Sequence, residues 1–200
     1  MDNISILQLK SPTTIEMTLT NTCNHKCLHC YNPWRASHNT KNDYFTKEEL
    51  EIFISELKKN DIWHVTISGG EPLTFFDVLK RTTKEFDKND IEYSINSNLT
   101  LINDEIAKFL KERTKFTNFI LTSLPSINKE TCDSITTIKG SYNKIIQGIA
   151  LAKKYGIEVG INMVISQKNI KDLETITEFL QEFDIDYLSI SLVIPPEYDS

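Results

Sequence analysis

Short apolar segments alternate with amphipathic ones along almost the whole chain. Near the N-terminus, Ile15, Met17 and Leu19 alternate with polar residues, a spacing of two that predicts a strand ending just before the first cysteine. Further apolar runs of strand length follow at 62–67, 91–95, 118–122, 157–165 and 187–194. The pattern therefore predicts six strands.

Apolar residues at helical spacing occupy most of the stretches between these strands. After Thr46 and Glu49, which form a capping box, Leu50 and Leu57 mark one face of a helix. A second helix is predicted from about 75 to 86, and a third carries Ile106, Phe109 and Leu110. A fourth carries Ile145, Ile149 and Ala152 and ends at Gly156. A fifth carries Leu173, Ile176 and Leu180 after a cap at Asn169. The stretch from 123 to 140 is expected to be a loop.

Strands that alternate with helices, without hairpins between them, indicate parallel strands joined by helical crossovers. Six such strands can form an open doubly wound sheet or a partial barrel, and periodicity does not choose between the two. Both arrangements place ligands at the carboxyl ends of the strands. No low-complexity tract or linker interrupts the series, so residues 1–200 are expected to form one α/β domain.

Composition narrows the class of protein. The 22 basic and 28 acidic residues give a net charge of −6, which argues against a nucleic-acid partner. No run of about 18 apolar residues exists, so a membrane span is not expected. The N-terminus lacks the basic start and the following apolar run that a signal peptide has. These features predict a cytoplasmic location, where structural disulfides are rare.

Three of the four cysteines, Cys23, Cys27 and Cys30, lie close together directly after the first predicted strand. A disulfide knot, a zinc site and an iron–sulfur cluster are the alternatives, and a reducing cytoplasm disfavours the knot. Zinc would take His25 or His29 as a fourth ligand, but zinc ligands usually come in two separated pairs. The single continuous run favours an iron–sulfur cluster.

A second motif, ISGGEPL at 67–73, follows the second predicted strand and belongs to the same edge of the sheet. Gly69 and Gly70 lack Cβ atoms and allow the backbone to approach a ligand closely. Glu71 offers a carboxylate to an ammonium group, and Pro72 fixes the turn. A pair of glycines alone is typical of a plain strand-to-helix turn, but beside three cysteines it indicates a ligand site.

The two motifs together, CNHKCLHC at 23–30 and GGEP at 69–72, resemble the radical S-adenosylmethionine (SAM) superfamily. Two later segments, SINSNLTLI at 94–102 and the stretch 122–149, resemble the strand-three and strand-four regions of that family. The resemblance implies a partial (β/α)6 TIM-type barrel of parallel strands. It points to the SPASM-type branch, which modifies peptides and proteins.

The resemblance also implies a chemistry. Cys23, Cys27 and Cys30 would hold three irons of a [4Fe–4S] cluster, and the open fourth iron would bind SAM. Reductive cleavage of SAM would give a 5′-deoxyadenosyl radical that removes hydrogen from a substrate, expected to be a peptide or protein. A reductant such as ferredoxin or flavodoxin would supply the electron. Cys132 is expected to be a half-buried structural residue.

Further residues acquire roles only through this resemblance. Gly69, Gly70 and Glu71 would meet the methionine end of SAM, with Glu71 accepting its ammonium protons. The remaining predicted cofactor contacts are Ser68, Asn96 and Asn98, and Ser123 at the end of strand four. His29 is expected to pack near the adenine, and His25 to be exposed to solvent. No residue is singled out as catalytic.

The remaining expectations concern packing and completeness. Trp63, Phe53, Phe86 and Phe109 are expected in the core, and Trp34 near the cluster or the substrate. The chain stops soon after the last strand, so an exposed apolar face is expected around 188–194. Such a chain is expected to bind a cluster and SAM but to turn over its native substrate poorly. A non-catalytic or truncated barrel, an electron carrier and a zinc-stabilised binding module remain the alternatives.

Overall fold

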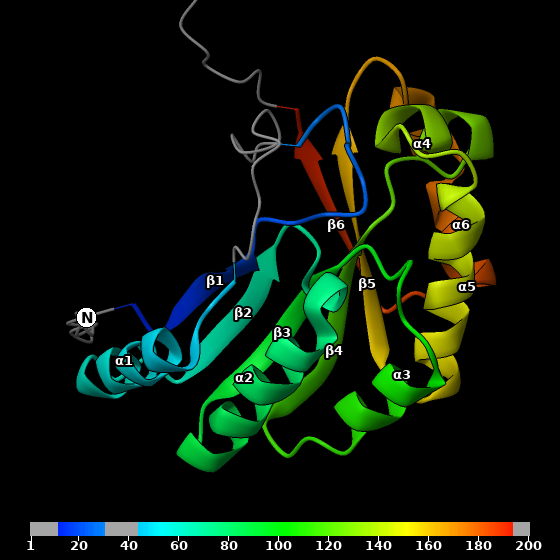
Figure 1. Ribbon diagram of the computed structural model, residues 1–200. Coiled ribbons are helices and arrows are strands. Elements are labelled where there is room, and N and C mark those ends of the chain that lie inside the picture. Colours follow the sequence, from blue (N-terminus) through cyan, green and yellow to red (C-terminus); the bar gives the residue numbers. More distant parts are fainter. Residues whose placement is uncertain (1–11, 31–43, 194–200) are drawn as a thin grey trace, which may run out of the picture.

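The computed structural model describes residues 12–30 and 44–193, which form one parallel sheet flanked by helices (Figure 1). The strands are β1 (Thr14–Thr20), β2 (His64–Gly69), β3 (Glu92–Ser97), β4 (Phe116–Ser123), β5 (Glu158–Ile165) and β6 (Tyr187–Leu192). The helices are α1 (Lys47–Lys59), α2 (Phe76–Asn89), α3 (Asp104–Lys111), α4 (Lys129–Thr136), α5 (Ser141–Lys154) and α6 (Ile176–Glu182), with 3₁₀ turns η2 (Pro72–Phe75) and η3 (Ile170–Glu174). The predicted strand–helix alternation is confirmed.

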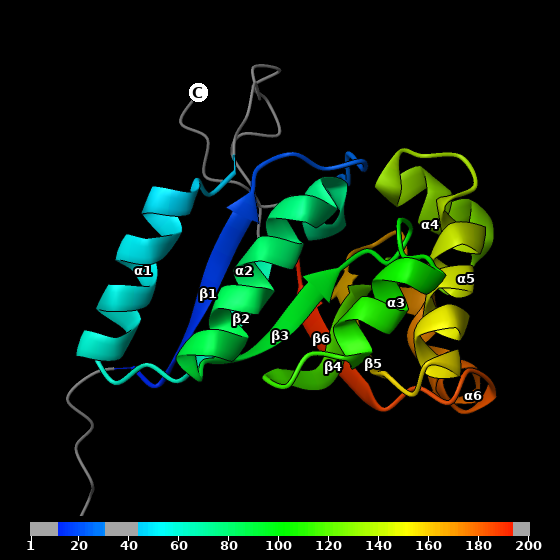
Figure 2. The same cartoon turned by 60° about the horizontal axis from the view of Figure 1, so that its bottom comes forward.

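The order of the strands decides between the two predicted architectures. The sheet runs β1-β2-β3-β4-β5-β6, with every neighbouring pair parallel. A doubly wound sheet would reverse its strand order partway, and this sheet does not. Figures 1 and 2 show the helices along the outer side of the curved sheet. Within the described residues β1 and β6 do not pair, so the protein is an unclosed, partial barrel.

The two faces of the sheet differ in polarity. Alternate strand residues such as Met17, Val65 and Ile161 are buried beneath the helices and form the core. The residues between them point to the opposite face, which we call the inner face. There Glu16 pairs in register with Thr66, a polar row on the first two strands. The core therefore lies between sheet and helices, and the inner face is left for other contacts.

Two predicted elements differ from the structure. The stretch 123–140 is not only a loop, because α4 lies within it, capped by Asn128, whose side chain accepts the Thr131 N–H at 2.9 Å. Its eight residues are too few for a clear periodic signal. Asn169 does not cap a helix through its side chain. Its amide instead donates to Pro125 O and Val164 O, and the predicted helix divides into η3 and α6.

The predicted capping box and most of the core are confirmed. Thr46 and Glu49 exchange both hydrogen bonds at the start of α1. Phe86 is fully buried, and Phe53 and Phe109 pack against the core. Trp63 contradicts its prediction, because 54% of it is exposed. It directly precedes β2, and among the described residues the helices leave this end of the strand partly uncovered.

The last strand is poorly covered. Ile190 is 48% exposed and Leu192 is 75% exposed, and Tyr187 and Val193 are also exposed. The expected exposed apolar surface is therefore confirmed for the part of 188–194 that the structure describes. Trp34 lies outside the described residues.

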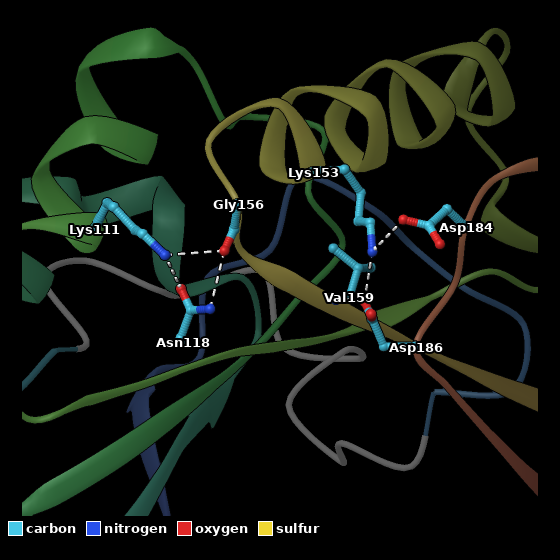
Figure 3. A network of polar contacts seen from close by, with 7 residues as sticks. All are labelled: Lys111, Asn118, Lys153, Gly156, Val159, Asp184 and Asp186. Atoms are coloured by element: carbon cyan, nitrogen blue, oxygen red, sulfur yellow. Dashed lines mark hydrogen bonds and ion pairs between the residues drawn. The ribbon is translucent and has the colours of Figure 1, made fainter.

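Polar side chains join the connections at the amino ends of the later strands (Figure 3). Asn118, near the start of β4, donates to Gly156 O at 2.9 Å. Lys111, at the end of α3, donates to Asn118 Oδ1 at 2.9 Å and to Gly156 O at 3.0 Å. The end of α3, the start of β4 and the turn that precedes β5 thus share one hydrogen-bond network.

A second group of contacts ties β5 to the residues before β6 (Figure 3). Asp186 accepts the Val159 N–H at 2.7 Å and pairs with Lys153 Nζ at 2.8 Å. Asp184 pairs with the same Nζ at 3.0 Å but is 91% exposed. Burial alone would raise the pKa of Asp186, but the bonds from Lys153 and Val159 outweigh it and lower the pKa. The ionised carboxylate therefore stabilises the fold.

We expect Asp186→Ala to lower the free energy of unfolding by about 1–3 kcal/mol, because it leaves the Val159 N–H without its acceptor. Asp184→Asn is the matched control, because asparagine tolerates the φ of 49° at this position while the substitution removes the charge. It should cost less than about 1 kcal/mol, since exposed ion pairs contribute little. Urea denaturation measures both.

The dependence on pH has a definite sign. A carboxyl whose pKa is lowered by folding stabilises fully above its unfolded pKa, and this contribution disappears as the pH falls through the folded pKa. The difference between wild type and Asp186→Ala should therefore shrink below about pH 4. A difference that is constant from pH 7 to pH 3 would contradict the role of the charge.

Candidate functional site

A cavity of about 330 Å³ opens at the carboxyl ends of the strands. Its walls come from the cysteine-bearing loop after β1, the two glycines at the end of β2, and the ends of β3, β4 and β5. The sequence-predicted residues among its lining are Cys23, Cys27, Cys30, Ser68, Gly69, Gly70, Asn96, Asn98 and Ser123. Glu71 is the predicted site residue that the lining lacks. Segments far apart in the sequence thus meet in one cavity.

The cysteine loop, residues 23–30, is anchored on helix α4. The Leu28 N–H donates to Ile135 O at 2.8 Å, and the Lys26 N–H donates to Thr136 O at 3.2 Å. These acceptors belong to the last turn of α4, where carbonyls have no partner within the helix. Thr137 returns a bond from its Oγ1 to Lys26 O at 3.2 Å. The helix that sequence analysis missed therefore supports the loop that it singled out.

All four cysteines are free thiols, and three of them share the cavity. As a residue Cys23 is exposed, yet burial of its sulfur raises the pKa of the thiol to about 11. Cys132 is not among the residues that line the cavity, and it is fully buried in α4, more deeply than expected. Burial raises the pKa of that thiol to about 11 as well. Its interpretation as a structural residue agrees with this position.

The donor set of the cavity can be compared with the groups it is predicted to hold. Among the described residues, no three His, Cys, Asp or Glu side chains gather closely enough to hold a single metal ion. Three thiols around one cavity fit an iron–sulfur cluster, whose irons are held by cysteine thiolates. The residues present therefore fit the implied group.

The two glycines form a wall by packing against backbone. The Gly70 N–H donates to Thr20 O at 2.7 Å, and the Glu71 N–H donates to Thr22 O at 2.9 Å. A Cβ at Gly69 would collide with Thr20 O, and one at Gly70 with Thr22 O. We call residues 69–70 the glycine wall. Its glycines are required for close approach to the segment that enters the cysteine loop, whereas the sequence suggested close approach to a ligand.

Glu71 directly follows the glycine wall, and its side chain is buried and hydrogen-bonded to neighbouring segments. The residue is 1% exposed, and its Oε1 accepts the Leu73 N–H at 3.0 Å and the Ser97 hydroxyl at 2.8 Å. Its Oε2 accepts the Asn98 N–H at 2.7 Å. Burial raises the pKa of the carboxyl, and these hydrogen bonds counteract part of that rise. The carboxylate joins the end of β2 to the end of β3, and its contact with an ammonium group stays a prediction.

The two histidines of the cysteine loop both line the cavity. His25 is 7% exposed, so its predicted exposure to solvent is wrong. The anchoring of the loop on α4 explains the burial, because it places the neighbouring Lys26 backbone against Thr136. Burial, together with the nearby Lys144 ammonium, lowers the pKa of His25. The expected packing of His29 near an adenine stays a prediction.

Residues that the sequence motifs do not include extend the cavity along the inner face. Glu16 of β1, Leu121 of β4, and Asn162 and Val164 of β5 all contribute to the lining. Register pairs Ser123 with Asn162 on adjacent strands. The alternation of polar and apolar residues contained the signal for Glu16 and Asn162, since both are polar residues within predicted strands. Motif spacing alone could not find them.

Comparisons with known proteins agree with this geometry. The family model described as the Radical SAM superfamily matches residues 17–180. Fe-coproporphyrin III synthase of Methanosarcina barkeri is 30% identical over 173 residues, covering 86% of this chain and 42% of that protein. A probable GTP 3′,8-cyclase of Methanocaldococcus jannaschii is 31% identical over 171 residues, covering 84% of this chain and 55% of that protein. The chain thus spans about half the length of these relatives.

A solved structure matches the fold. Streptococcus suis SuiB bound to S-adenosylmethionine superposes with a TM-score of 0.76 at 20% identity, over 94% of this chain and 44% of that chain. SuiB has also been solved bound to precursor peptide SuiA. Likeness at this identity concerns the fold alone. Within the described residues, no helix of this protein is long and apolar enough to cross a membrane.

We expect Gly70→Ala to lower the free energy of unfolding by about 1–3 kcal/mol, because the new methyl group collides with Thr22 O. Displacement of Thr22 should also change the rate at which the adjacent Cys23 reacts with a maleimide. Gly140→Ala is the control: its Cβ meets open space, so only its φ of +83° adds strain. Equal labelling of Cys23 in all three proteins would contradict the role given to the wall.

Proposed function

The chain belongs to the radical SAM superfamily, whose members use a [4Fe–4S] cluster and SAM, and on that premise we propose that it cleaves SAM reductively to begin radical chemistry on a substrate. One observation carries the proposal. The three cysteines of the family motif and the glycines of its second motif line the same cavity, although they come from different strands. The cavity lies at the carboxyl ends of the strands, where barrels of this type carry their active sites.

Each part of the cavity has a proposed task. Cys23, Cys27 and Cys30 would hold the cluster, and the glycine wall would receive the methionine end of SAM. When bound, the reduced cluster supplies the electron that breaks a carbon–sulfur bond of SAM, giving the 5′-deoxyadenosyl radical that removes hydrogen from the substrate. Ser68, Asn96, Asn98 and Ser123 would contact the rest of the cofactor, as their place in the lining allows.

The chain's own residues prepare this site in two ways. The α4 carbonyls hold the backbone of the cysteine loop, so the positions of the thiols depend less on the cluster itself. Glu71 holds Ser97 Oγ and the Asn98 N–H, so the ends of β2 and β3 keep a fixed separation. Pre-arrangement of this kind lowers the cost of ordering the site when the cofactor binds.

The finer part of the proposal concerns partners. We propose a peptide or protein substrate, because SuiB, which shares the fold, has been solved with a precursor peptide. The names of the two relatives point instead to a porphyrin and a nucleotide, so these are the comparison substrates. We also propose a ferredoxin or flavodoxin as reductant and a reducing cytoplasm as the location, which suits four free thiols.

Anaerobic reconstitution with iron and sulfide tests the cluster. Wild-type protein should bind about four irons per chain and show broad visible absorption that bleaches with dithionite. Cys23→Ala, Cys27→Ala and Cys30→Ala should each abolish that absorption. Cys132→Ala is the matched control and should retain it, since this thiol lies outside the cavity lining. Loss of the cluster in the control with retention in a loop variant would contradict the ligand assignment.

The same sample separates the alternative functions. With SAM and dithionite, the proposed enzyme should release 5′-deoxyadenosine. A non-catalytic barrel would show a cluster and SAM binding without that product. An electron carrier would show a cluster that does not respond to SAM, and a zinc-stabilised module would show no visible absorption.

The Glu71 carboxylate provides a separate prediction. Glu71 is buried and lies outside the cavity lining, but its carboxylate holds Ser97 and Asn98, which line the cavity. Glu71→Ala should retain the cluster but weaken SAM binding by about one to two decades in dissociation constant, since hydrogen bonds to charged groups contribute roughly 1.5–3 kcal/mol. Glu71→Gln should also weaken it, because both carboxylate oxygens accept a backbone N–H and an amide NH₂ must oppose one of them. Spectroscopic titration of the cluster with SAM measures the effect, and unchanged affinity in both variants would exclude the role.

A further inference from the structure

Three side chains close a ring of hydrogen bonds between the cysteine loop and the end of β3. Asn98 Nδ2 donates to Asn24 Oδ1 at 2.8 Å, and Asn24 Nδ2 donates to Thr100 Oγ1 at 2.8 Å. The Thr100 hydroxyl then donates to Asn98 Oδ1 at 2.6 Å. Each amide gives one proton and accepts another, so the directions of the three bonds are mutually consistent. We call these three residues the amide ring.

The backbone that carries two members of the amide ring, Asn98 and Thr100, packs against α5. Asn98 is followed by Leu99, a fully buried residue whose φ of 56° is unusual for a side chain of this size. The carbonyl of Leu99 packs against Gly148 of α5, where a Cβ would collide with it. The Thr100 N–H also bonds to Asn98 Oδ1 at 3.0 Å. Packing against α5 therefore fixes the backbone that carries Asn98 and Thr100.

The amide ring is connected to the backbone on both sides of Cys23. Asn24 directly follows Cys23, so the ring fixes the backbone next to the first thiol. Asn98 donates its backbone N–H to Glu71, whose own N–H holds Thr22 O on the other side of Cys23. The first cysteine is thus held from both sides by segments that meet at Glu71. Cys27 and Cys30 lie on the part of the loop that α4 supports.

We propose that Asn24, Asn98 and Thr100 are positioning residues that hold Cys23 in place before any cluster is bound, and that they couple the glycine wall to the cysteine loop through Glu71. Any ligand that favours one arrangement of the wall then favours one arrangement of Cys23, and the reverse holds equally. The inference rests on the proposed function only for its statements about the loaded protein. The statement about the metal-free loop stands on the geometry alone.

Thr100→Val is the sharpest test, because it removes one hydroxyl and Thr100 does not line the cavity. The Thr100 hydroxyl accepts from Asn24 and donates to Asn98, so its loss breaks two bonds of the ring. Hydrogen exchange, measured by mass spectrometry on metal-free protein, should therefore show residues 23–26 exchanging at least roughly fivefold faster, the size expected for one net hydrogen bond. Thr100→Ser restores the hydroxyl and should return exchange to the wild-type rate. Exchange in peptides from 158–165 reports global stability, and its rate should not change.

Thr117→Val is the matched control. It makes the same substitution at a threonine whose hydroxyl donates a single bond, from Thr117 Oγ1 to Tyr93 O at 3.1 Å, at the opposite end of the sheet. It should leave exchange of the loop unchanged. Unchanged exchange of 23–26 in Thr100→Val, or an equal rise in Thr117→Val, would overturn the proposal.

A second arm uses reconstituted protein. Thr100→Val should release iron to a chelator roughly fivefold faster than wild type and should shift the midpoint potential of the cluster, while Thr100→Ser and Thr117→Val should do neither. An unchanged rate of iron loss and an unchanged potential in Thr100→Val would overturn the role of the ring in the loaded protein. If wild-type protein forms no cluster, the proposed function fails, and the exchange experiment still decides the role of the ring.

Discussion

The site depends on how closely two backbones approach each other at the carboxyl ends of β1 and β2. The Gly70 N–H reaches Thr20 O at 2.7 Å, a contact that side chains at Gly69 or Gly70 would prevent. This approach sets where the chain leaves the sheet, and the cysteine loop begins three residues after Thr20. Glu71 then carries the same constraint to β3. A short stretch without side chains thus sets the relative positions of the cavity's parts.

The two ends of the sheet serve different purposes. At the amino ends, charged side chains such as Lys153 and Asp186 hold connections together, and their geometry concerns stability. At the carboxyl ends, polar groups around the cavity bond mainly to backbone and to one another, as Glu71 does. Barrels commonly divide these roles in the same way. The unclosed edge at β6 leaves apolar side chains such as Leu192 uncovered, and this edge belongs to neither role.

Much of the fold could be predicted because the strands follow a simple rule of alternation. Met17 and Val65 are buried and Glu16 faces the cavity, as a period of two requires. The motifs brought the cysteines and glycines together correctly because parallel strands end at one edge. Burial of His25 and support by α4 could not be predicted, since both depend on tertiary contacts between segments about a hundred residues apart. The hydrogen bonds of Glu71 could not be predicted either, because the sequence does not distinguish a carboxylate that binds a ligand from one that accepts backbone N–H groups.

The anchoring of the cysteine loop has a consequence for biosynthesis. The thiols at 23–30 are translated well before their supports at Thr100, Ile135 and Thr136. Until α4 is formed, the Lys26 and Leu28 N–H groups of the loop lack the carbonyl acceptors described above. Productive assembly of the site must therefore wait until about two thirds of these 200 residues have been translated.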